Sequence, residues 1–438
     1  MKKLNYQNIF CFISILFIMS CCIFYGTRFI KLYLENQKDT SNAKNSLAEK
    51  IIDINQNKDT FKNINNEYYF IGNAENNYLE YSNIIWRIIK VTENNEILAI
   101  SDHSLTSLAY GKDLTYSDSY INKWLNTTTD TYSGILEKAL NNKDEFLTKT
   151  ITCHDQIDTI DNSACTNTTA NTYLSLLSTS DFANVGKNSY LFNNEYYYLA
   201  NTNTENKVWQ ISDDGKISTS TGQDIIGIRP VITLKSNLKY LSGSGSKNDP
   251  YIIEAERGLF GSYVKLDNSI WQIYQVNDNE IRLMLNDYLQ VNNKDFTYNY
   301  SNTSSYYNDT KNGSIAYYLN NTYLKTLSYK DKLSEVSWPN GYYGSSANYN
   351  YQASLETNIQ SKIALISIGD IILNHNLSNY YTMTGTSKNS TMLYTITPNK
   401  KLTTKYLTNE LNVVPTISLN KDLLISGNGT IESPYEME

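Results

Sequence analysis

The 438-residue sequence contains few arginines and histidines and little proline or cysteine. Only five of its 37 basic residues are arginine, and the net charge is −7, so no basic surface suited to nucleic acid is expected. The three histidines, His103, His154 and His375, are scattered and form no metal-ligand motif. A Gly-x-Ser-x-Gly elbow, a P-loop and a dinucleotide fingerprint are all absent. We therefore expect no catalytic residues, no cofactor and no metal site, and the protein is predicted not to be an enzyme.

The five cysteines divide into two groups. Cys11, Cys21 and Cys22 lie in an apolar N-terminal run, and Cys153 and Cys165 are the only cysteines in the rest of the chain. An isolated pair outside a membrane predicts a disulfide that closes a short loop and stabilises the fold by about 3 kcal/mol. The alternative is a pair of free thiols in a cytosolic protein, which the N-terminal run does not favour.

The N-terminus predicts a membrane anchor. Residues 9–25 are apolar almost throughout, at the lower length limit of a spanning helix, and follow a short, positively charged segment, 1–8. This arrangement predicts that residues 1–8 lie in the cytoplasm, that residues 9–25 form a single-pass transmembrane helix and that the domains after it are extracellular. A cleaved signal peptide and a lipoprotein anchored at Cys21 are the alternatives. Residues 26–66 are polar and are expected to form a stalk.

Two segments of the chain occur twice. YLEYSNIIWRIIKV at Tyr78–Val91 returns as YVKLDNSIWQIYQV at Tyr263–Val276, with Trp86 opposite Trp271. The segment that begins GIRPVITL at Gly227 also returns, as NVVPTISL from residue 412. The sequence therefore predicts two copies of one domain.

The predicted repeat domains are residues 67–255 and 260–438, and the second copy is degenerate. Within the first copy we expect short helices over Ser119–Leu125 and Ser133–Leu147. Antiparallel hairpins are expected around them, one with an Asp-Gly turn after Ser212. Short helices mixed with hairpins predict an α+β fold: a transmembrane helix followed by two tandem mixed α/β domains.

Several motifs of the first copy resemble a known family. These motifs are Asn76–Tyr78 with Trp86–Ile88, Trp124–Asn126, Leu176–Asp181, Gly227–Val231 and Ser242–Tyr251. They resemble exported, largely uncharacterised tandem-domain surface proteins of low-GC Gram-positive bacteria. The order of the motifs is also similar to the C-type-lectin-like fold, although the Ca²⁺-binding signatures of those lectins are absent.

The resemblance implies a cell-surface recognition protein that binds a glycan, a peptide or an envelope polymer. The alternative is a structural or scaffold protein of the cell envelope without a small-molecule ligand, and an enzyme is a third class. The expected partners are the membrane, through the N-terminal helix, and a glycan or surface protein. No nucleic acid is expected as a partner, and the sequence leaves the oligomeric state open.

Two arginines are candidate binding residues. Arg87 and Arg229 both lie in apolar strands, and the second copy has Gln272 and Val414 in their places. If the two guanidinium groups lie close together, they could hold an anionic ligand. The alternative is that each arginine binds carboxylates or carbonyl groups of the fold itself.

Two further features are candidates for sugar contacts. Trp209 and Tyr197 could present exposed rings for stacking, although a partly buried aromatic cluster explains them equally well. Asp155, Asp158 and Asp161 step through the loop between the cysteines, but they lack the spacing of a Ca²⁺-binding loop.

Overall fold

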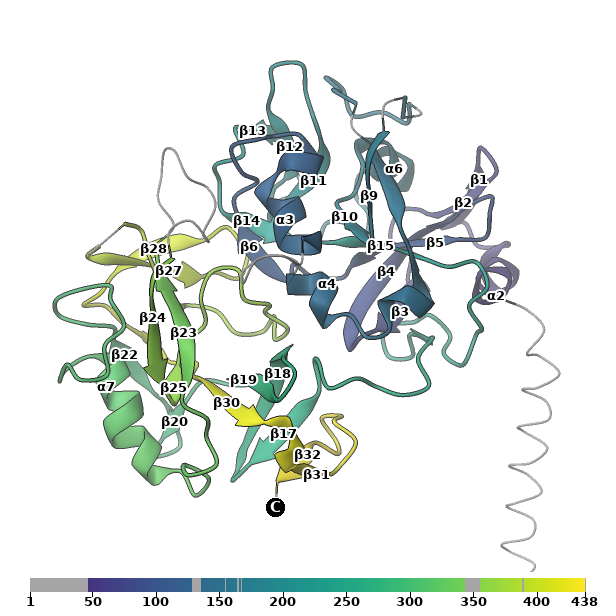
Figure 1. Ribbon diagram of the computed structural model, residues 1–438. Coiled ribbons are helices and arrows are strands. Elements are labelled where there is room, and N and C mark those ends of the chain that lie inside the picture. Colours follow the sequence, from purple (N-terminus) through teal and green to yellow (C-terminus); the bar gives the residue numbers. More distant parts are fainter. Residues whose placement is uncertain are drawn as a thin grey trace, which may run out of the picture.

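The computed structural model describes residues 46–127, 135–153, 155–163, 165–166, 168–342, 355–387 and 390–437. The chain forms two halves, residues 46–260 and 261–437, each built around its own apolar core (Figure 1). The structure is 37% strand and 14% helix. This mostly β architecture contradicts the predicted α+β class and its likeness to the C-type-lectin-like fold.

The prediction of a transmembrane helix is also corrected. Among the described residues, no helix has the length and apolar composition needed to cross a membrane. The longest helix in the described ranges has nine residues, whereas a membrane span needs about 20. Residues 9–25 and the N-terminal cysteines lie outside the described residues. The single-pass topology and the extracellular placement derived from it therefore lose their support.

The main sheet of the first half is largely antiparallel. Its strands are β1 (Phe61–Ile64), β2 (Glu67–Phe70), β3 (Tyr78–Tyr81), β4 (Ile84–Val91), β5 (Ile97–Ser101), β7 (Leu147–Thr148), β10 (Leu174–Ser175), β15 (Val231–Leu234) and β16 (Tyr251–Ile252). The order is β1-β2-β4-β5-β15-β10, β7 pairs with β15, and β3 lies between β4 and β16. The pairing of β16 with β3 is parallel.

A second sheet and a hairpin complete the β structure of the first half. The sheet has the order β13 (Ile217–Ser220), β12 (Val208–Ile211), β11 (Tyr197–Thr202), β14 (Ile226–Ile228) and β6 (Thr106–Leu108). The hairpin consists of β8 (Thr150–Cys153) and β9 (Thr168–Thr172). The predicted Asp-Gly hairpin corresponds to β12 and β13, and Gly215 takes the positive φ of 77° that its turn requires.

The helices of the first half are short. They are α2 (Leu47–Asn55), η1 (Tyr116–Asp118), α3 (Tyr120–Asn126), α4 (Ile135–Ala139), α5 (Lys143–Phe146) and α6 (Thr179–Val185). The single helix predicted over residues 133–147 is interrupted, because Asn142 takes a left-handed conformation with φ of 46°. Asparagine tolerates the left-handed conformation better than most residues do, and a residue in that conformation ends a helix.

The second half repeats this arrangement. Its main sheet has the order β25 (Ile363–Ala364), β30 (Thr416–Asn420), β19 (Glu280–Leu285), β18 (Ser269–Val276), β17 (Tyr263–Leu266), β32 (Tyr435–Met437) and β31 (Leu424–Ser426). Its second sheet has the order β22 (Thr297–Asn299), β29 (Glu410–Asn412), β26 (Tyr380–Gly385), β27 (Met392–Ile396) and β28 (Thr403–Tyr406). The hairpins are β20 (Gln290–Val291) with β21 (Lys294–Asp295) and β23 (Val336–Gly341) with β24 (Leu355–Ser361). The helical turns are α7 (Ile315–Tyr317), η2 (Tyr318–Thr322), η3 (Tyr323–Thr326) and η5 (Lys421–Leu423).

Six strands of each main sheet correspond in order. The order β10-β15-β5-β4-β3-β16 in the first half equals β25-β30-β19-β18-β17-β32 in the second. Trp86 on β4 and Trp271 on β18 are both fully buried in these central strands. Because the tryptophans and the strand register match, positions of one half can be compared directly with positions of the other.

The end of the predicted stalk belongs to the first half. Helix α2 begins with a capping box between Ser46 and Glu49, and its apolar face, which includes Leu47 and Ile51, is buried. The backbone N–H of Leu47 donates to the carbonyl oxygen of Leu238 over 2.7 Å. Helix α2 therefore packs on the first half and does not stand off from it as a stalk would.

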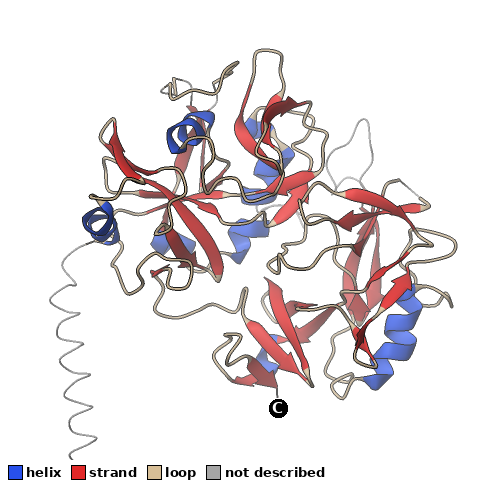
Figure 2. Ribbon diagram, turned by 180° about the vertical axis from the view of Figure 1, so that it is seen from behind, coloured by secondary structure: helices blue, strands red, loops and turns tan. Residues whose placement is uncertain are grey.

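Two loops of the second half form hydrogen bonds to the first half. Figure 2 shows loops where the two halves meet. Docking loop 1 is residues 368–376, and docking loop 2 is residues 397–402 between β27 and β28. Ile368 and Ile371 of docking loop 1 are buried in the apolar core of the first half. The indole N–H of Trp124 donates to the carbonyl oxygen of Gly369 over 2.8 Å. Apolar burial and hydrogen bonding thus join the two halves.

We predict that Ile371→Ala lowers the free energy of unfolding by about 2–4 kcal/mol, because it removes a buried side chain from the contact between the halves. Urea unfolding monitored by circular dichroism measures the change. Ile425→Ala is the matched control, since Ile425 is 59% exposed and its truncation is expected to change stability by less than about 0.5 kcal/mol. Equal urea midpoints for the two variants would contradict the assignment.

Candidate functional site

Arg87 is held inside the first half by partners of the fold. Its Nε donates to Oδ1 of Asn77 over 2.8 Å and its Nη2 donates to the carbonyl oxygen of Ala74 over 2.7 Å. Nη1 lies 3.4 Å from Oδ1 of Asp102, and the guanidinium carbon lies 3.8 Å from the centre of the Tyr78 ring. The side chain is buried, so the fold itself uses its donors.

Arg229 is also held by partners of the fold. Its Nε donates to the carbonyl oxygen of Ser101 over 3.0 Å, and its Nη1 donates to that of Leu191 over 2.7 Å. It is fully buried, and its guanidinium carbon lies 4.9 Å from the centre of the Tyr197 ring. The two arginines fix loops to the sheet, as the structural alternative expects, and they form no accessible anion clamp.

The two candidate aromatic residues are not exposed platforms. Tyr197 is fully buried, and its hydroxyl donates to the carbonyl oxygen of Leu191 over 3.1 Å. Trp209 is half-buried against the core, and its indole N–H donates to the carbonyl oxygen of Ile157 over 2.7 Å. Both rings therefore support packing within the first half.

The predicted cysteine pair forms a disulfide. Cys153 and Cys165 are bonded to each other, with their Cα atoms 5.7 Å apart. Within the loop, Asp158 accepts hydrogen bonds from the backbone N–H and the hydroxyl of Thr204. Asp161 accepts from the backbone N–H of Ser163, so both carboxylates bind neighbouring groups of the chain.

We predict that Arg87→Gln, which introduces the residue of the second copy, lowers the free energy of unfolding by about 3 kcal/mol. The glutamine cannot satisfy Asp102, Asn77 and the Ala74 carbonyl together, so buried polar groups lose their partner. Urea unfolding checks this value. Arg257→Gln is the matched control and is expected to cost less than about 1 kcal/mol, because the Arg257 side chain is 42% exposed.

A cavity of about 420 Å³ opens in the first half. It lies between the main sheet, the β8–β9 hairpin with its disulfide, and the beginning of α6. Its lining contains charged, apolar and hydroxyl-bearing side chains, among them Glu67, Lys90, Leu98, Asp181 and Thr233. None of the sequence-predicted arginines or aromatic residues lines this cavity, whereas both cysteines do.

A charged network forms one wall of the cavity. Nζ of Lys90 lies 2.8 Å from Oδ1 of Asp181 and 3.0 Å from Oε2 of Glu67. The hydroxyl of Tyr69 contacts the same two carboxylates at 2.8 and 3.0 Å. Burial alone would raise the pKa of Asp181, but the Lys90 ammonium and hydrogen bonds from Ser178 and Tyr69 outweigh burial and hold this pKa below its usual value.

The corresponding place in the second half is filled. Leu98 pairs with Lys90 and Thr233 in the sheet, and Arg282 has the equivalent position between Gln275 and Ser418. The guanidinium carbon of Arg282 lies 4.6 Å from the centre of the ring of Trp338, which is 1% exposed. Trp338 lies on β23, and the β23–β24 hairpin has the place in the chain order that the β8–β9 hairpin has in the first half. An arginine and a tryptophan therefore fill the space that stays open in the first half.

We predict that Lys90→Met lowers the free energy of unfolding by about 3 kcal/mol at pH 7, because Glu67 and Asp181 lose their counter-ion. The folded-state pKa of Asp181 is depressed, so the stability it contributes is complete above its unfolded pKa of about 3.9, declines below that value and is lost as pH falls through the lowered folded-state pKa. The loss caused by Lys90→Met should therefore be smaller at pH 3.5 than at pH 7. Unfolding titrations at both pH values test this, with Lys62→Met, an exposed lysine, as the control.

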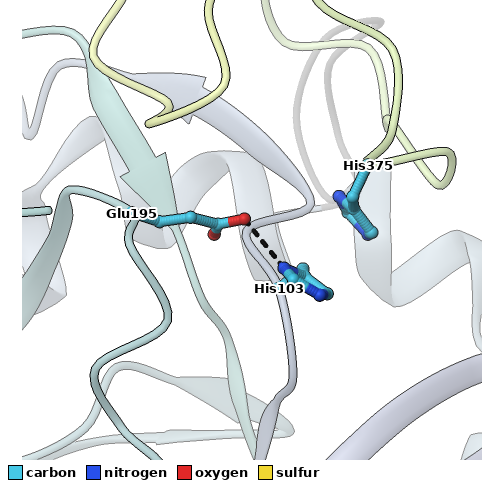
Figure 3. A group of neighbouring side chains, drawn as sticks. All are labelled: His103, Glu195 and His375. Atoms are coloured by element: carbon cyan, nitrogen blue, oxygen red, sulfur yellow. Dashed lines mark hydrogen bonds and ion pairs between the residues drawn. The ribbon is translucent and has the colours of Figure 1, made fainter.

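Three ionisable residues that sequence reasoning did not connect meet between the halves (Figure 3). His103 follows β5, Glu195 precedes β11, and His375 belongs to docking loop 1. Nδ1 of His103 lies 2.9 Å from Oε1 of Glu195, and the His103 and His375 rings stack with centres 4.6 Å apart. The local signal in the sequence is a polar Asp-His pair directly after an apolar strand, but nothing in the sequence links it to His375.

Burial shapes the protonation of this cluster. Burial would raise the pKa of Glu195, but the hydrogen bond and charge of His103 outweigh it and lower the pKa to about 2. Burial lowers the pKa of His375 to about 3, assisted by the charges of His103 and Lys400. Lys400, in docking loop 2, is also buried, and burial lowers its pKa. At neutral pH the cluster therefore contains a carboxylate and a neutral His375 imidazole.

No family model, curated protein or solved structure matches this chain.

Proposed function

We propose that the protein is a recognition protein whose first half binds a small, hydroxyl-rich ligand, such as a sugar unit of a glycan, in its cavity. The observation that carries the proposal is the contrast between the halves. One fold leaves a cavity of about 420 Å³ in the first copy, and Arg282 and Trp338 fill the corresponding place in the second. A cavity of this size lies within the usual range of small-molecule sites.

The lining of the cavity supports a hydroxyl-rich ligand. Hydroxyl groups come from Ser175, Ser178 and Ser180, and an amide comes from Asn184. The hydroxyl oxygen of Thr233 is buried without a hydrogen-bond partner among the described residues. Such groups both donate and accept hydrogen bonds, as the hydroxyl groups of a sugar require.

The charged side chains that line the cavity limit which ligands it can bind. The carboxylates of Glu67, Glu96 and Asp181 line the cavity, and Lys90 supplies the ammonium group. Lys90 is already paired with two of these carboxylates. A ligand with a phosphate or carboxylate would therefore meet repulsion, whereas a neutral polyol or an amino sugar would find acceptors.

The second half then has a supporting role. Its arginine and tryptophan remove the cavity, while its docking loops pack against the first half. These contacts also favour the second candidate function, a structural protein in which the two domains act as a rigid unit. The two functions differ in whether the cavity binds a ligand.

The test is a ligand-observed NMR screen of neutral, amino and acidic saccharides and of short peptides against the purified full chain. We expect binding of at least one neutral or amino saccharide, with a Kd in the range of about 1 μM to 1 mM. Leu98→Trp places a large ring in the cavity, much as Trp338 occupies the corresponding place in the second half. This variant should weaken saccharide binding at least about tenfold. Leu241→Trp is the matched control, because Leu241 is exposed and does not line the cavity, and its binding should be unchanged.

The proposal fails if no saccharide binds, or if Leu98→Trp binds as tightly as the unmodified chain. Circular dichroism of both tryptophan variants separates loss of binding from loss of folding. Binding of a peptide alone would leave a recognition function with a different ligand class and would reject the saccharide.

A further inference from the structure

We infer that His103, Glu195 and His375 form a site for one transition-metal ion, such as Zn²⁺, that joins the two halves of the chain. One potential ligand atom of each residue lies within 4.8 Å of the other two. Two imidazoles and one carboxylate are a donor set that binds Zn²⁺ in proteins and leaves a fourth position for water. The site is separate from the proposed recognition function, because it shares no residue with the cavity of the first half.

Two of the ligands are already placed as neighbours on one ion. The 2.9 Å between Nδ1 of His103 and Oε1 of Glu195 is close to the spacing of about 3.3 Å expected for two ligands of a tetrahedral zinc ion. The metal would take the place of the proton that now lies between these atoms. The other oxygen of Glu195 accepts a hydrogen bond from the backbone N–H of Ser104 over 2.8 Å, which fixes the carboxylate.

The third ligand has an unsatisfied buried atom. Nδ1 of His375 is buried and has no hydrogen-bond partner among the described residues. Leaving a buried polar atom unpaired is costly, and coordination to a metal ion would satisfy it. The His103 and His375 rings stack at an interplanar angle of 25°, and because imidazole lone pairs lie in the ring plane, one ring must turn for both to bind one ion. The two histidines come from different halves, so an ion bound to both would span the contact between the halves.

A second carboxylate is placed behind His103. Oδ2 of Asp102 lies 3.7 Å from Nε2 of His103, while its Oδ1 lies 3.4 Å from Nη1 of Arg87. A carboxylate on the far nitrogen is the usual partner of a metal-bound histidine, where it fixes the tautomer and the ring orientation. At 3.7 Å Asp102 makes no hydrogen bond to His103, so it is a charged neighbour of the site that Arg87 holds in place.

Lys400 is the unfavourable neighbour of the site. Its Nζ is buried without a hydrogen-bond partner among the described residues, and its charge acts on both Glu195 and His375. An ammonium group beside a cation costs free energy. Burial lowers the pKa of Lys400.

The test is calorimetric titration of the chelator-treated full chain with Zn²⁺. We expect one ion per chain with a Kd below about 1 μM, and a thermal unfolding temperature that rises with Zn²⁺. His103→Gln, Glu195→Gln and His375→Gln should each weaken binding at least about 100-fold and remove the thermal shift. His154→Gln is the matched control, since it removes an imidazole but none of the three ligands.

A spectroscopic measurement keeps the test independent of folding defects. Co²⁺ bound to the unmodified chain should give the intense visible absorption of a four-coordinate ion with nitrogen and oxygen ligands, and His375→Gln should lose it. Circular dichroism without metal shows whether each variant is folded. Absence of stoichiometric binding, or binding that a folded His375→Gln variant retains, would overturn the assignment.

Discussion

A tryptophan buried in the middle of a sheet is the constraint on which both halves depend. Trp86 and Trp271 are each fully buried, and each lies on a central strand with neighbours on both sides. A side chain of this size fixes the spacing between the sheet and the elements that cover it, because protein interiors are closely packed. The strands that flank these tryptophans pair in the same register in both halves.

The repeated segments predict the part of the fold that depends on apolar spacing. Burial is nondirectional, so a tryptophan and a run of aliphatic residues at the same spacing specify the same strand in both copies. Helix content was harder to predict, since a left-handed residue at Asn142 divides a segment whose composition suits one helix. The segment around Leu47 has the capping box of a helix, but its tertiary contact with Leu238 could not be inferred from local sequence.

The candidate sites show where sequence reasoning stops. An arginine in an apolar strand predicts either a ligand contact or an internal bond, and only the placement of Asp102 and Asn77 decides for Arg87. His103, Glu195 and His375 come from three separate loops, so their proximity is a property of how the halves dock. The cavity could not be predicted from the sequence either, because it lies where the first half has Leu98 and the second half has the larger Arg282.

The two halves share their strand order but differ in the residues at the cavity position. Both copies keep the same strand order, yet the first holds an open cavity and a disulfide, and the second holds Trp338 over Arg282. Positions that differ between the copies do not determine the strand order, although each copy can depend on its own residue there for stability. Such positions are where one copy can gain or lose a binding site while keeping the fold.

The parallel pairing of β16 with β3 sets the order in which the first half can be completed during synthesis. Tyr251 pairs with Leu79, so the strand that covers this side of β3 is among the last parts of the half to be translated. Until it arrives, that side of β3 has unpaired backbone groups, and such edges associate readily with other chains. Closing the chain between β3 and β16 costs conformational entropy before their contact forms, and contacts between distant parts of a sequence slow folding. A ribosome that pauses before residue 251 would thus hold a nascent chain with an exposed sheet edge, at the stage when aggregation competes most strongly with folding.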